Sequence, residues 1–224
     1  MLVNMQVKNE RSGSSTIICA FPLFSVDLPK PYPSIRTMII PPSHLDLLYT
    51  PAQLDAQLSS VAAELDTWTG PAESETGRLL LCVCLLRGGM FFFSDTLLHM
   101  RHSVEPAFCR AWAYSKLTLE QPEEVIRMEW QSLDPAGRDV VLFDNICDSG
   151  RTFVAATAWL KERGARSVKT VTMVHRLRDD SVHAPTLTGF TFSGKEWLVG
   201  YGLRDRDSHM MNTRSIYTAR GTGI

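Results

Sequence analysis

The stretch Asp139-Val-Val-Leu-Phe-Asp-Asn-Ile-Cys-Asp-Ser-Gly-Arg-Thr-Phe153 decides the predicted fold of this chain. Its apolar run, Val140 to Phe143, has the length and the β-branched content of a buried strand. A polar turn that contains glycine, 148–152, follows, and residues 153–163 are predicted to form a helix. A strand that leads through such a turn into a helix presents free backbone N–H groups to an anion, so this stretch predicts a phosphate site. The simpler alternative is an ordinary turn with Asp148 as the helix N-cap.

Two further predicted strands also end in polar residues. The run of eight apolar residues at 79–86 is typical of a strand buried on both faces of a parallel sheet, and it leads through Arg87-Gly88-Gly89 into a helix at about 90–100. The strand predicted at 168–174 ends at His175-Arg176. Because ligands bind at the carboxyl ends of parallel strands, the three turns are expected to face one site.

The alternation of strands and helices predicts an α/β fold with a mainly parallel, twisted sheet flanked by helices. Thr50 and Pro51 have the N-cap and N1 chemistry of a helix start, and the apolar stripe that follows predicts a helix ending near Gly70, with a polar loop at 70–77. A strand is expected at 108–114 and a hairpin arm at 124–128. Gly164 is expected to end the helix of the motif.

Composition restricts the possible classes of protein. The 224 residues carry a formal net charge of −1, so no overall field favours nucleic acid. No apolar run reaches about 18 residues, which predicts no membrane span. The five cysteines lack zinc-ligand spacing and are read as reduced thiols, which favours the cytoplasm. Residues 1–43 are rich in proline and predict an irregular extension before a domain at 44–224. A signal peptide is the alternative there, although Pro22 interrupts its apolar run.

The motif at 144–152 resembles the phosphoribosyl-diphosphate (PRPP) motif of type I phosphoribosyltransferases, and the hypoxanthine-guanine branch is the closest match. Three more segments agree in order: Leu48-Tyr49-Thr50 with its helix, Leu85 to Asp95, and Lys195-Glu-Trp-Leu-Val-Gly-Tyr-Gly-Leu203. The resemblance covers about 44–215. It implies the type I fold, with a small hood formed by the C-terminal segment.

The resemblance also implies a function. The enzyme would transfer the 5-phosphoribosyl group from PRPP to a purine or purine-like base, releasing pyrophosphate, as in purine salvage. It implies Mg²⁺ as the cofactor, PRPP and a purine-like base as partners, and a homodimer or homotetramer, with no nucleic-acid or membrane partner.

Each site residue takes a role by position in these motifs. Asp148 would be the acid/base group facing N7 of the base. The implied binding residues are, for the 5-phosphate, Ser149, Gly150, Arg151 and Thr152; for the ribose, Asp144 and Asn145; for pyrophosphate, Leu86, Arg87 and Gly88; for the base, His175, Trp197 and Leu198; for the loop that closes over the site, Tyr114 and Ser115; and for the metal, Asp205.

Several positions depart from the family pattern. Asn145 replaces an acidic residue, Arg87 replaces a common lysine, and His175 stands where the family has a lysine that contacts the 6-oxo group of the base. Arg204 stands where the family has a metal-contacting Asp, with Asp205 one step on, and Met210 falls where the family has an Arg. These changes leave two alternatives open: a modified base such as a 7-deazapurine, or a PRPP- or nucleotide-sensing protein without catalysis.

Overall fold

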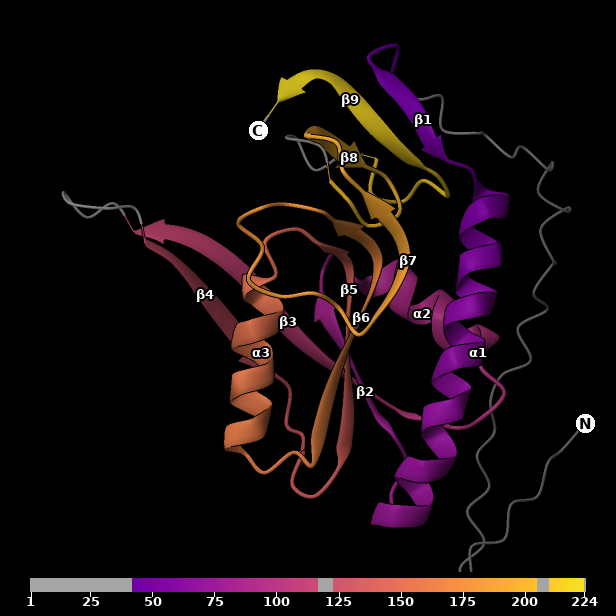
Figure 1. The fold of residues 1–224 in the computed structure, drawn as a ribbon, viewed down its shortest axis with the longest axis vertical. Helices are drawn as coiled ribbons and strands as arrows, with labels where there is room; N and C mark the ends of the chain where they lie inside the picture. Colours follow the sequence, from indigo (N-terminus) through magenta and orange to yellow (C-terminus); the bar gives the residue numbers. More distant parts are fainter. Residues whose placement is uncertain (1–41, 117–122, 205–209, 224) are drawn as a thin grey trace, which may run out of the picture. The chain divides into compact units, whose positions relative to one another are not determined.

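The computed structural model describes residues 42–116, 123–204 and 210–223, which all belong to one compact unit, 39–224. Figure 1 shows its elements. In chain order they are β1 (Leu45–Tyr49), α1 (Pro51–Thr76), β2 (Leu81–Leu86), α2 (Met90–His99), β3 (Glu105–Lys116), β4 (Glu123–Trp130), β5 (Asp139–Cys147), α3 (Arg151–Glu162), β6 (Ser167–Arg176), β7 (Leu187–Phe192), β8 (Glu196–Val199) and β9 (Ile216–Gly223).

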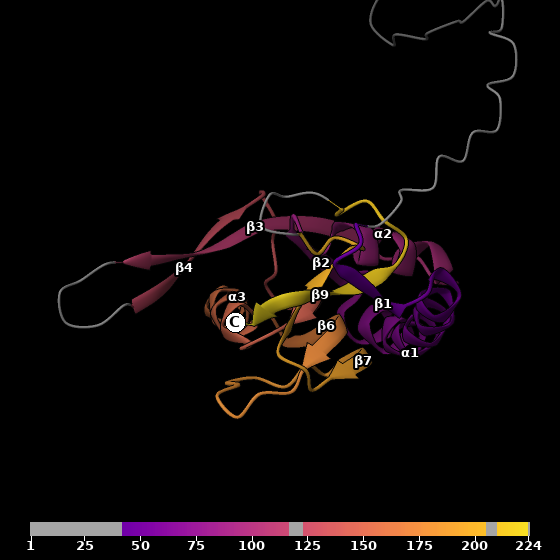
Figure 2. The same ribbon diagram turned by 90° about the horizontal axis from the view of Figure 1, so that it is seen from above.

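The main sheet has six strands in the order β4-β3-β2-β5-β6-β7, and only the edge strand β4 runs antiparallel to its neighbour. Helix α3 covers one face, and α1 and α2 cover the other, as Figures 1 and 2 show from two directions. The predicted α/β class is therefore confirmed. β5 lies inside the sheet between β2 and β6, which places the end of the motif strand in the middle of one sheet edge.

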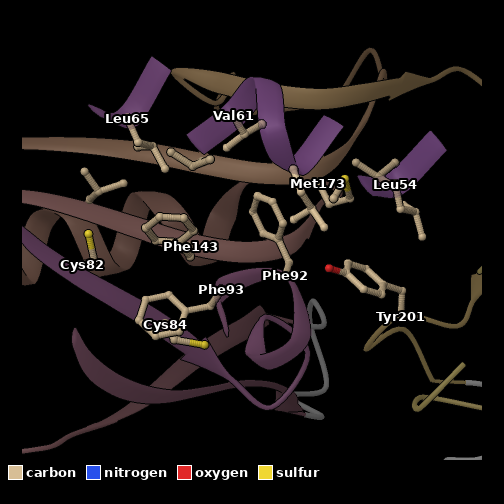
Figure 3. Close-up of a cluster of buried hydrophobic side chains, with 14 of the residues drawn as sticks. Leu54, Val61, Leu65, Cys82, Cys84, Phe92, Phe93, Phe143, Met173 and Tyr201 are labelled. Atoms are coloured by element: carbon tan, nitrogen blue, oxygen red, sulfur yellow. The ribbon is translucent and has the colours of Figure 1, made fainter. Parts of the chain in front are cut away.

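The apolar run of β5 is buried on both faces because its side chains alternate. Val140 and Leu142 join the cluster under α3, whereas Val141 and Phe143 join the cluster under α1 and α2. Phe143 contacts the rings of Phe92 and Phe93 at centroid distances of 5.8 and 5.2 Å (Figure 3). This packing fixes the strand from which the polar turn emerges.

A second, smaller sheet forms the hood, with strand order β1-β9-β8 and antiparallel pairing. β8 and β9 come from the C-terminal segment, as predicted. β1 was missed, because residues 45–49 were read only as the approach to the following helix. Its partner β9 lies more than 160 residues away in sequence, and no local pattern reveals such a pairing.

Helix α1 begins as predicted and ends later than predicted. Thr50 and Gln53 form a capping box, with Thr50 accepting from the Gln53 N–H at 3.3 Å. The predicted end at Gly70 and loop at 70–77 are wrong, because the helix runs through Pro71 to Thr76 and stops at Gly77. Burial of Thr69 and Ala72 continues the apolar stripe, and this packing outweighs the backbone hydrogen bond that a proline removes.

Replacing Leu65 of α1 with alanine tests the packing of this helix. Leu65 is fully buried, so Leu65→Ala should lower the free energy of unfolding by about 2–5 kcal/mol in denaturant titrations. Leu98→Ala on α2 is the matched control, since Leu98 is 81% exposed and the change should cost less than about 0.5 kcal/mol. Equal losses for the two variants would contradict the packing described here.

Candidate active site

A cleft of about 420 Å³ lies at the carboxyl ends of β2 and β5, beneath the hood. Three turns contribute to its walls: the turn after β2 (87–89), the motif turn after β5 (148–152) and the hood turn after β8 (200–204). Its lining residues include, from these turns and the strands beside them, Leu86, Arg87, Gly88, Arg110, Trp112, Asp144, Asn145, Asp148, Thr152, Arg176, Trp197, Leu198, Gly202 and Arg204. All three strand ends predicted to meet contribute to this cleft, the third one through Arg176 and not through His175. The hood turn adds a further wall.

The motif turn requires glycine at position 150. Its φ of 82° is left-handed, and a Cβ there would lie 2.6 Å from the Cβ of His183. Val182 donates to the Ser149 carbonyl at 2.9 Å, so the segment 181–183 holds the turn from outside. Helix α3 starts at Arg151, and the first backbone N–H groups of a helix have no partner within it. The turn therefore has the geometry of an anion site.

The turn after β2 approaches Asn145 closely. A Cβ on Gly88 would lie 2.9 Å from Oδ1 of Asn145, and one on Gly89 would lie 2.8 Å from the Leu85 carbonyl oxygen. The Leu86–Arg87 peptide bond is cis. Arg87 is exposed at the cleft wall. Both glycines are thus required for close backbone approach, as predicted from the sequence.

The hood turn packs directly on the turn after β2. Gly202 has a φ of 90°, and a Cβ on it would overlap the Gly88 carbonyl oxygen and lie 2.9 Å from Nδ2 of Asn145. Tyr201 donates its hydroxyl to Asp95 on α2 at 2.7 Å. The hood is therefore held against the sheet by one close backbone contact and one partly buried hydrogen bond.

Asp148 is held by two arginines that the sequence prediction did not place beside it. Its Oδ1 lies 3.2 Å from Nε of Arg176 and 3.1 Å from Nη1 of Arg178. Arg176 is buried and also donates to the backbone carbonyls of Gly194 and Glu196. Asp148 keeps 39% of its side chain exposed, so it is oriented by the arginines and still accessible from the cleft.

Asp144 lies deeper in the cleft than Asp148. Burial raises the pKa of its carboxyl to about 7, although the backbone N–H of Asn145 donates to it at 2.8 Å and opposes the shift. Near neutral pH this group is thus close to half-ionised. Cys147, the residue directly before the turn at 148–152, is buried, and burial raises the pKa of its thiol to about 12. It therefore stays protonated.

His175 does not face the cleft, and its predicted place on the base is wrong. It is in register with Cys147 of β5, which packs in the cluster under α3. Because successive side chains of a strand point to opposite faces, Arg176 points into the cleft instead. The strand parity of 170–176 was the signal in the sequence that could have shown this.

The other predicted base residues line the cleft. Trp197 and Leu198 belong to β8, and Trp197 donates its indole N–H to the Arg204 carbonyl at 2.7 Å. Arg110 and Trp112 were not predicted. They alternate along β3, and the Arg110 guanidinium lies 4.8 Å from the Trp112 ring centroid. Among the motif residues, Thr152 lines the cleft, and Ser149, Gly150 and Arg151 lie between it and Asp148 in the same turn.

Two predictions fall on less described parts of the chain. Tyr114 and Ser115 lie in β3, where their backbones are paired with Val125 and Glu124 of β4, and their closing role stays a prediction. The predicted metal residue Asp205 lies outside the described residues, as does almost all of the 1–43 extension. Within the described residues no helix is long and apolar enough to cross a membrane.

The described residues of the cleft do not provide a set of side chains suited to hold a metal ion. Within 42–116, 123–204 and 210–223, no group of three or more His, Cys, Asp or Glu side chains is placed to hold one. Of the two cleft carboxylates, Asp148 already contacts two guanidinium groups, and Asp144 lies beside the neutral Asn145. Mg²⁺ bound to the diphosphate of a substrate would not need such a set.

Comparison with known proteins defines the class. The family model "Phosphoribosyl transferase domain" matches residues 75–206. A hypoxanthine-guanine phosphoribosyltransferase from Mycobacterium avium is 26% identical over 159 residues, 70% of this chain and 77% of the relative. A bifunctional protein TilS/HprT from Listeria monocytogenes is 31% identical over 158 residues, 70% of this chain, and the matched part is only 23% of the length of that relative.

A solved structure agrees with these relatives. The hypoxanthine phosphoribosyltransferase from Staphylococcus aureus superposes with a TM-score of 0.67 at 23% identity, covering 79% of this chain and 92% of that one. The chain belongs to the phosphoribosyl transferase domain family. The resemblance to the hypoxanthine-guanine enzymes that was predicted from the sequence motifs is confirmed, together with the fold.

Gly202→Ala should destabilise the protein more than the same substitution does at a left-handed glycine that has free space around it. The variant combines backbone strain with overlap at Gly88, so we expect a loss of about 2–4 kcal/mol in the free energy of unfolding. Gly77→Ala is the control, because Gly77 has a φ of 67° with nothing within 4 Å and should lose only about 1–2 kcal/mol. Equal losses would mean that the hood does not pack on the turn after β2.

Asp144→Asn should make the protein more stable at high pH. The pKa of Asp144 in the fold, about 7, lies above its unfolded value, so ionisation destabilises the fold increasingly from about pH 4 to pH 7. Asn keeps an acceptor for the Asn145 N–H. Thermal unfolding should show little difference at pH 4 and a gain of up to about 4 kcal/mol above pH 7. A gain that is the same at every pH would contradict the raised pKa.

Proposed function

We propose that this chain transfers the 5-phosphoribosyl group from PRPP to a purine or purine-like base, with release of pyrophosphate and formation of a nucleoside monophosphate. One observation carries the proposal. The anion turn at 148–152, the turn at 86–89 and the hood turn open into a single cleft that also exposes Asp148. Such a cleft can hold two anionic groups and a planar base around one carboxylate.

The family resemblance implies a role for each residue, and the cleft brings most of these residues together. The backbone N–H groups and hydroxyls of 149–152 would bind the 5-phosphate at the start of α3. Asp144 and Asn145 would meet the ribose hydroxyls, and the turn at 86–88 would bind the pyrophosphate. Trp197 would stack on the base, and the backbone of Leu198 would meet its edge.

The chemistry follows from the charges that develop. As the bond between ribose C1 and pyrophosphate breaks, positive charge grows on the sugar and negative charge on the leaving group. N9 of the base attacks C1, and the Asp148 carboxylate can hold the proton at N7 while the ring is rearranged. Arg176 and Arg178 fix the orientation of that carboxylate. Mg²⁺, when bound to the diphosphate donor, supplies further charge neutralisation.

Arg176 also affects which base is favoured. It lines the cleft in place of His175, and a guanidinium is a donor only. A base that presents acceptors, such as a 6-oxopurine, therefore suits this end of the cleft better than one that presents an amino group. The cytoplasmic location, which the cysteines favour, and the homodimer or homotetramer, which the family resemblance implies, remain predictions.

A sensing protein on the same fold is the second candidate. The observation that favours it is Arg204, which stands at the cleft wall where the family pattern has a metal-contacting Asp. Such a protein would bind PRPP or a nucleotide and release no pyrophosphate.

A mass-spectrometric endpoint assay separates these functions. The protein is incubated with PRPP, Mg²⁺ and hypoxanthine, guanine, xanthine, adenine, uracil and a 7-deazaguanine, and every nucleotide product is identified. We expect the monophosphate of a 6-oxopurine. Only the 7-deazaguanine product would favour the modified-base enzyme, with Asp148 then facing a carbon. Binding of PRPP without any product would favour the sensor.

Asp148→Asn should lower the rate of nucleotide formation by about 10²- to 10⁴-fold, the usual contribution of a positioned acid/base group. Asp180→Asn is the matched control. Asp180 is also bound to Arg178, through Nε at 2.7 Å, but it is not among the residues that line the cleft. It should retain most of the activity. Full activity of Asp148→Asn would remove the role given to this carboxylate.

A further inference from the structure

The segment 178–183, which we call the clamp segment, lies against the motif turn. It belongs to the connection between β6 and β7 and passes beside the start of α3 (Figure 1). Its contacts with the turn and the residue before it are the Cys147 thiol with the His183 carbonyl at 3.7 Å, the Asp148 carboxylate with Arg178 at 3.1 Å, the Ser149 carbonyl with the Val182 N–H at 2.9 Å, and Gly150 with His183. The clamp segment thus supports the turn that is proposed to bind the 5-phosphate.

His183 anchors the clamp segment to the sheet and to α3. Its Nε2 lies 2.8 Å from the hydroxyl oxygen of Thr170 on β6, and its ring lies against Phe153 in the first turn of α3, at a centroid distance of 5.6 Å. Thr170 is buried, and its hydroxyl oxygen also accepts the Thr186 N–H at 3.2 Å. The Thr170 hydroxyl can therefore donate its own proton to a neutral imidazole.

The clamp segment depends on this anchor because it has no regular structure of its own. Residues 177–186 belong to no helix or strand. An irregular segment keeps one conformation only through its contacts with packed elements, since the entropy cost of ordering it must be offset. Val182 is 55% exposed and adds little packing. His183 reaches both β6 and α3, so removing its side chain should loosen the contacts at Ser149 and Gly150.

The surroundings of the His183 ring favour its neutral form. Burial lowers the pKa of His183, and repulsion from His175 on β6 lowers it further. The other titratable or charged groups on the elements around the ring are Cys147 and Asp148 on β5 and its turn, Arg151 at the start of α3, and Arg178, Asp179 and Asp180 in the clamp segment itself. Within 42–116, 123–204 and 210–223, no carboxylate forms an ion pair with this imidazole. A proton on it would therefore be an uncompensated charge beside Phe153.

We propose that His183 is a positioning residue for the motif turn, because its neutral imidazole holds the clamp segment against residues 147–150 and so keeps the backbone N–H groups of 149–152 arranged for a phosphate. The inference rests on the proposed function, since the phosphate concerned is that of PRPP. The support is complete above about pH 6.5, the usual pKa of histidine, and is lost as the pH falls below it and the ring is protonated. The affinity for PRPP should fall with it.

Calorimetry with PRPP and Mg²⁺ compares two replacements of His183. His183→Gln keeps a side-chain acceptor for Thr170 and cannot take up a proton, whereas His183→Ala removes the anchor. At neutral pH, His183→Ala should raise the dissociation constant of PRPP by about tenfold, the loss expected for one hydrogen bond, and His183→Gln should stay within about threefold of the unaltered chain. Equal weakening in both variants, or none in either, would overturn the role of His183.

The pH dependence separates positioning from a general structural role. Asp144 and the phosphates of PRPP also titrate in this range, so the dissociation constant of the unaltered chain is divided by that of His183→Gln at each pH. We expect this ratio to rise by about three- to tenfold from about pH 7.5 to pH 5.5, because only the unaltered chain gains a proton at position 183. A constant ratio would overturn the inference.

His44→Gln is the matched control for the titration. His44 is exposed and is not among the residues that line the cleft. The dissociation constant of the unaltered chain divided by that of His44→Gln should be the same at every pH. A ratio that rises as it does for His183→Gln would mean that any histidine produces the effect, and would overturn the assignment.

Changes at Thr170 keep the test decisive if His183→Ala does not fold. Thr170→Val has nearly the shape of threonine but lacks the hydroxyl beside Nε2, so it should weaken PRPP binding about tenfold. Thr170→Ser keeps the hydroxyl and should bind PRPP as the unaltered chain does. In the weakened variants that form nucleotide, the KM for PRPP should rise while kcat changes by less than about threefold. Full PRPP affinity of a folded Thr170→Val variant would contradict the anchor.

The failures of the two proposals can be told apart. PRPP binding that depends on His183, without any nucleotide product, would leave the inference standing and would remove the transferase function. Nucleotide formation with a PRPP affinity that does not depend on His183 would do the reverse. No binding of PRPP to the unaltered chain would overturn both.

Discussion

The contact between Gly202 and Gly88 is the constraint on which the site depends. Neither position tolerates a side chain, because the backbones of the hood turn and of the turn after β2 touch there and the Asn145 amide fills the space beside them. The two sheets of the domain meet at this point. Without the contact, the hood residues Trp197 and Arg204 would not share a cleft with the ends of β2 and β5.

The packing of β5 in the core also fixes the geometry of the site. A strand buried on both faces cannot shift its register without exposing apolar side chains, so its polar end is held in place by the core. Asp144 and Asn145 lie in the last part of that strand, and Asp148 is the first residue after it. The cost of this arrangement is visible at Asp144, whose carboxyl is desolvated, and at Asn145, whose amide nitrogen has no hydrogen-bond partner within the described residues. Polar groups that are desolvated or unsatisfied in this way are typical of sites that bind ligands.

Local chemistry made much of this predictable from the sequence. The capping box at Thr50, the glycines of the two turns and the apolar run of β5 each carry a local signal, and the α/β class and most of the cleft followed from them. The rest depended on contacts distant in the chain. β1 forms only because β9 covers it, and α1 passes Pro71 because Ala72 is buried. The pairing of Asp148 with Arg176 and Arg178 joins segments that are distant in the chain, and the face of the sheet on which His175 lies depends on strand parity, so a local motif reveals neither.

The central claim is that the three turns surround one ribose phosphate with its base. A crystal structure of the protein soaked with inosine monophosphate tests it most directly. The account predicts electron density for the phosphate at the backbone of 149–152, the ribose at Asp144 and Asn145, and the purine ring against Trp197 with its 6-oxo edge toward Arg176. Density for the nucleotide in another place, or with the base away from Trp197, would contradict it.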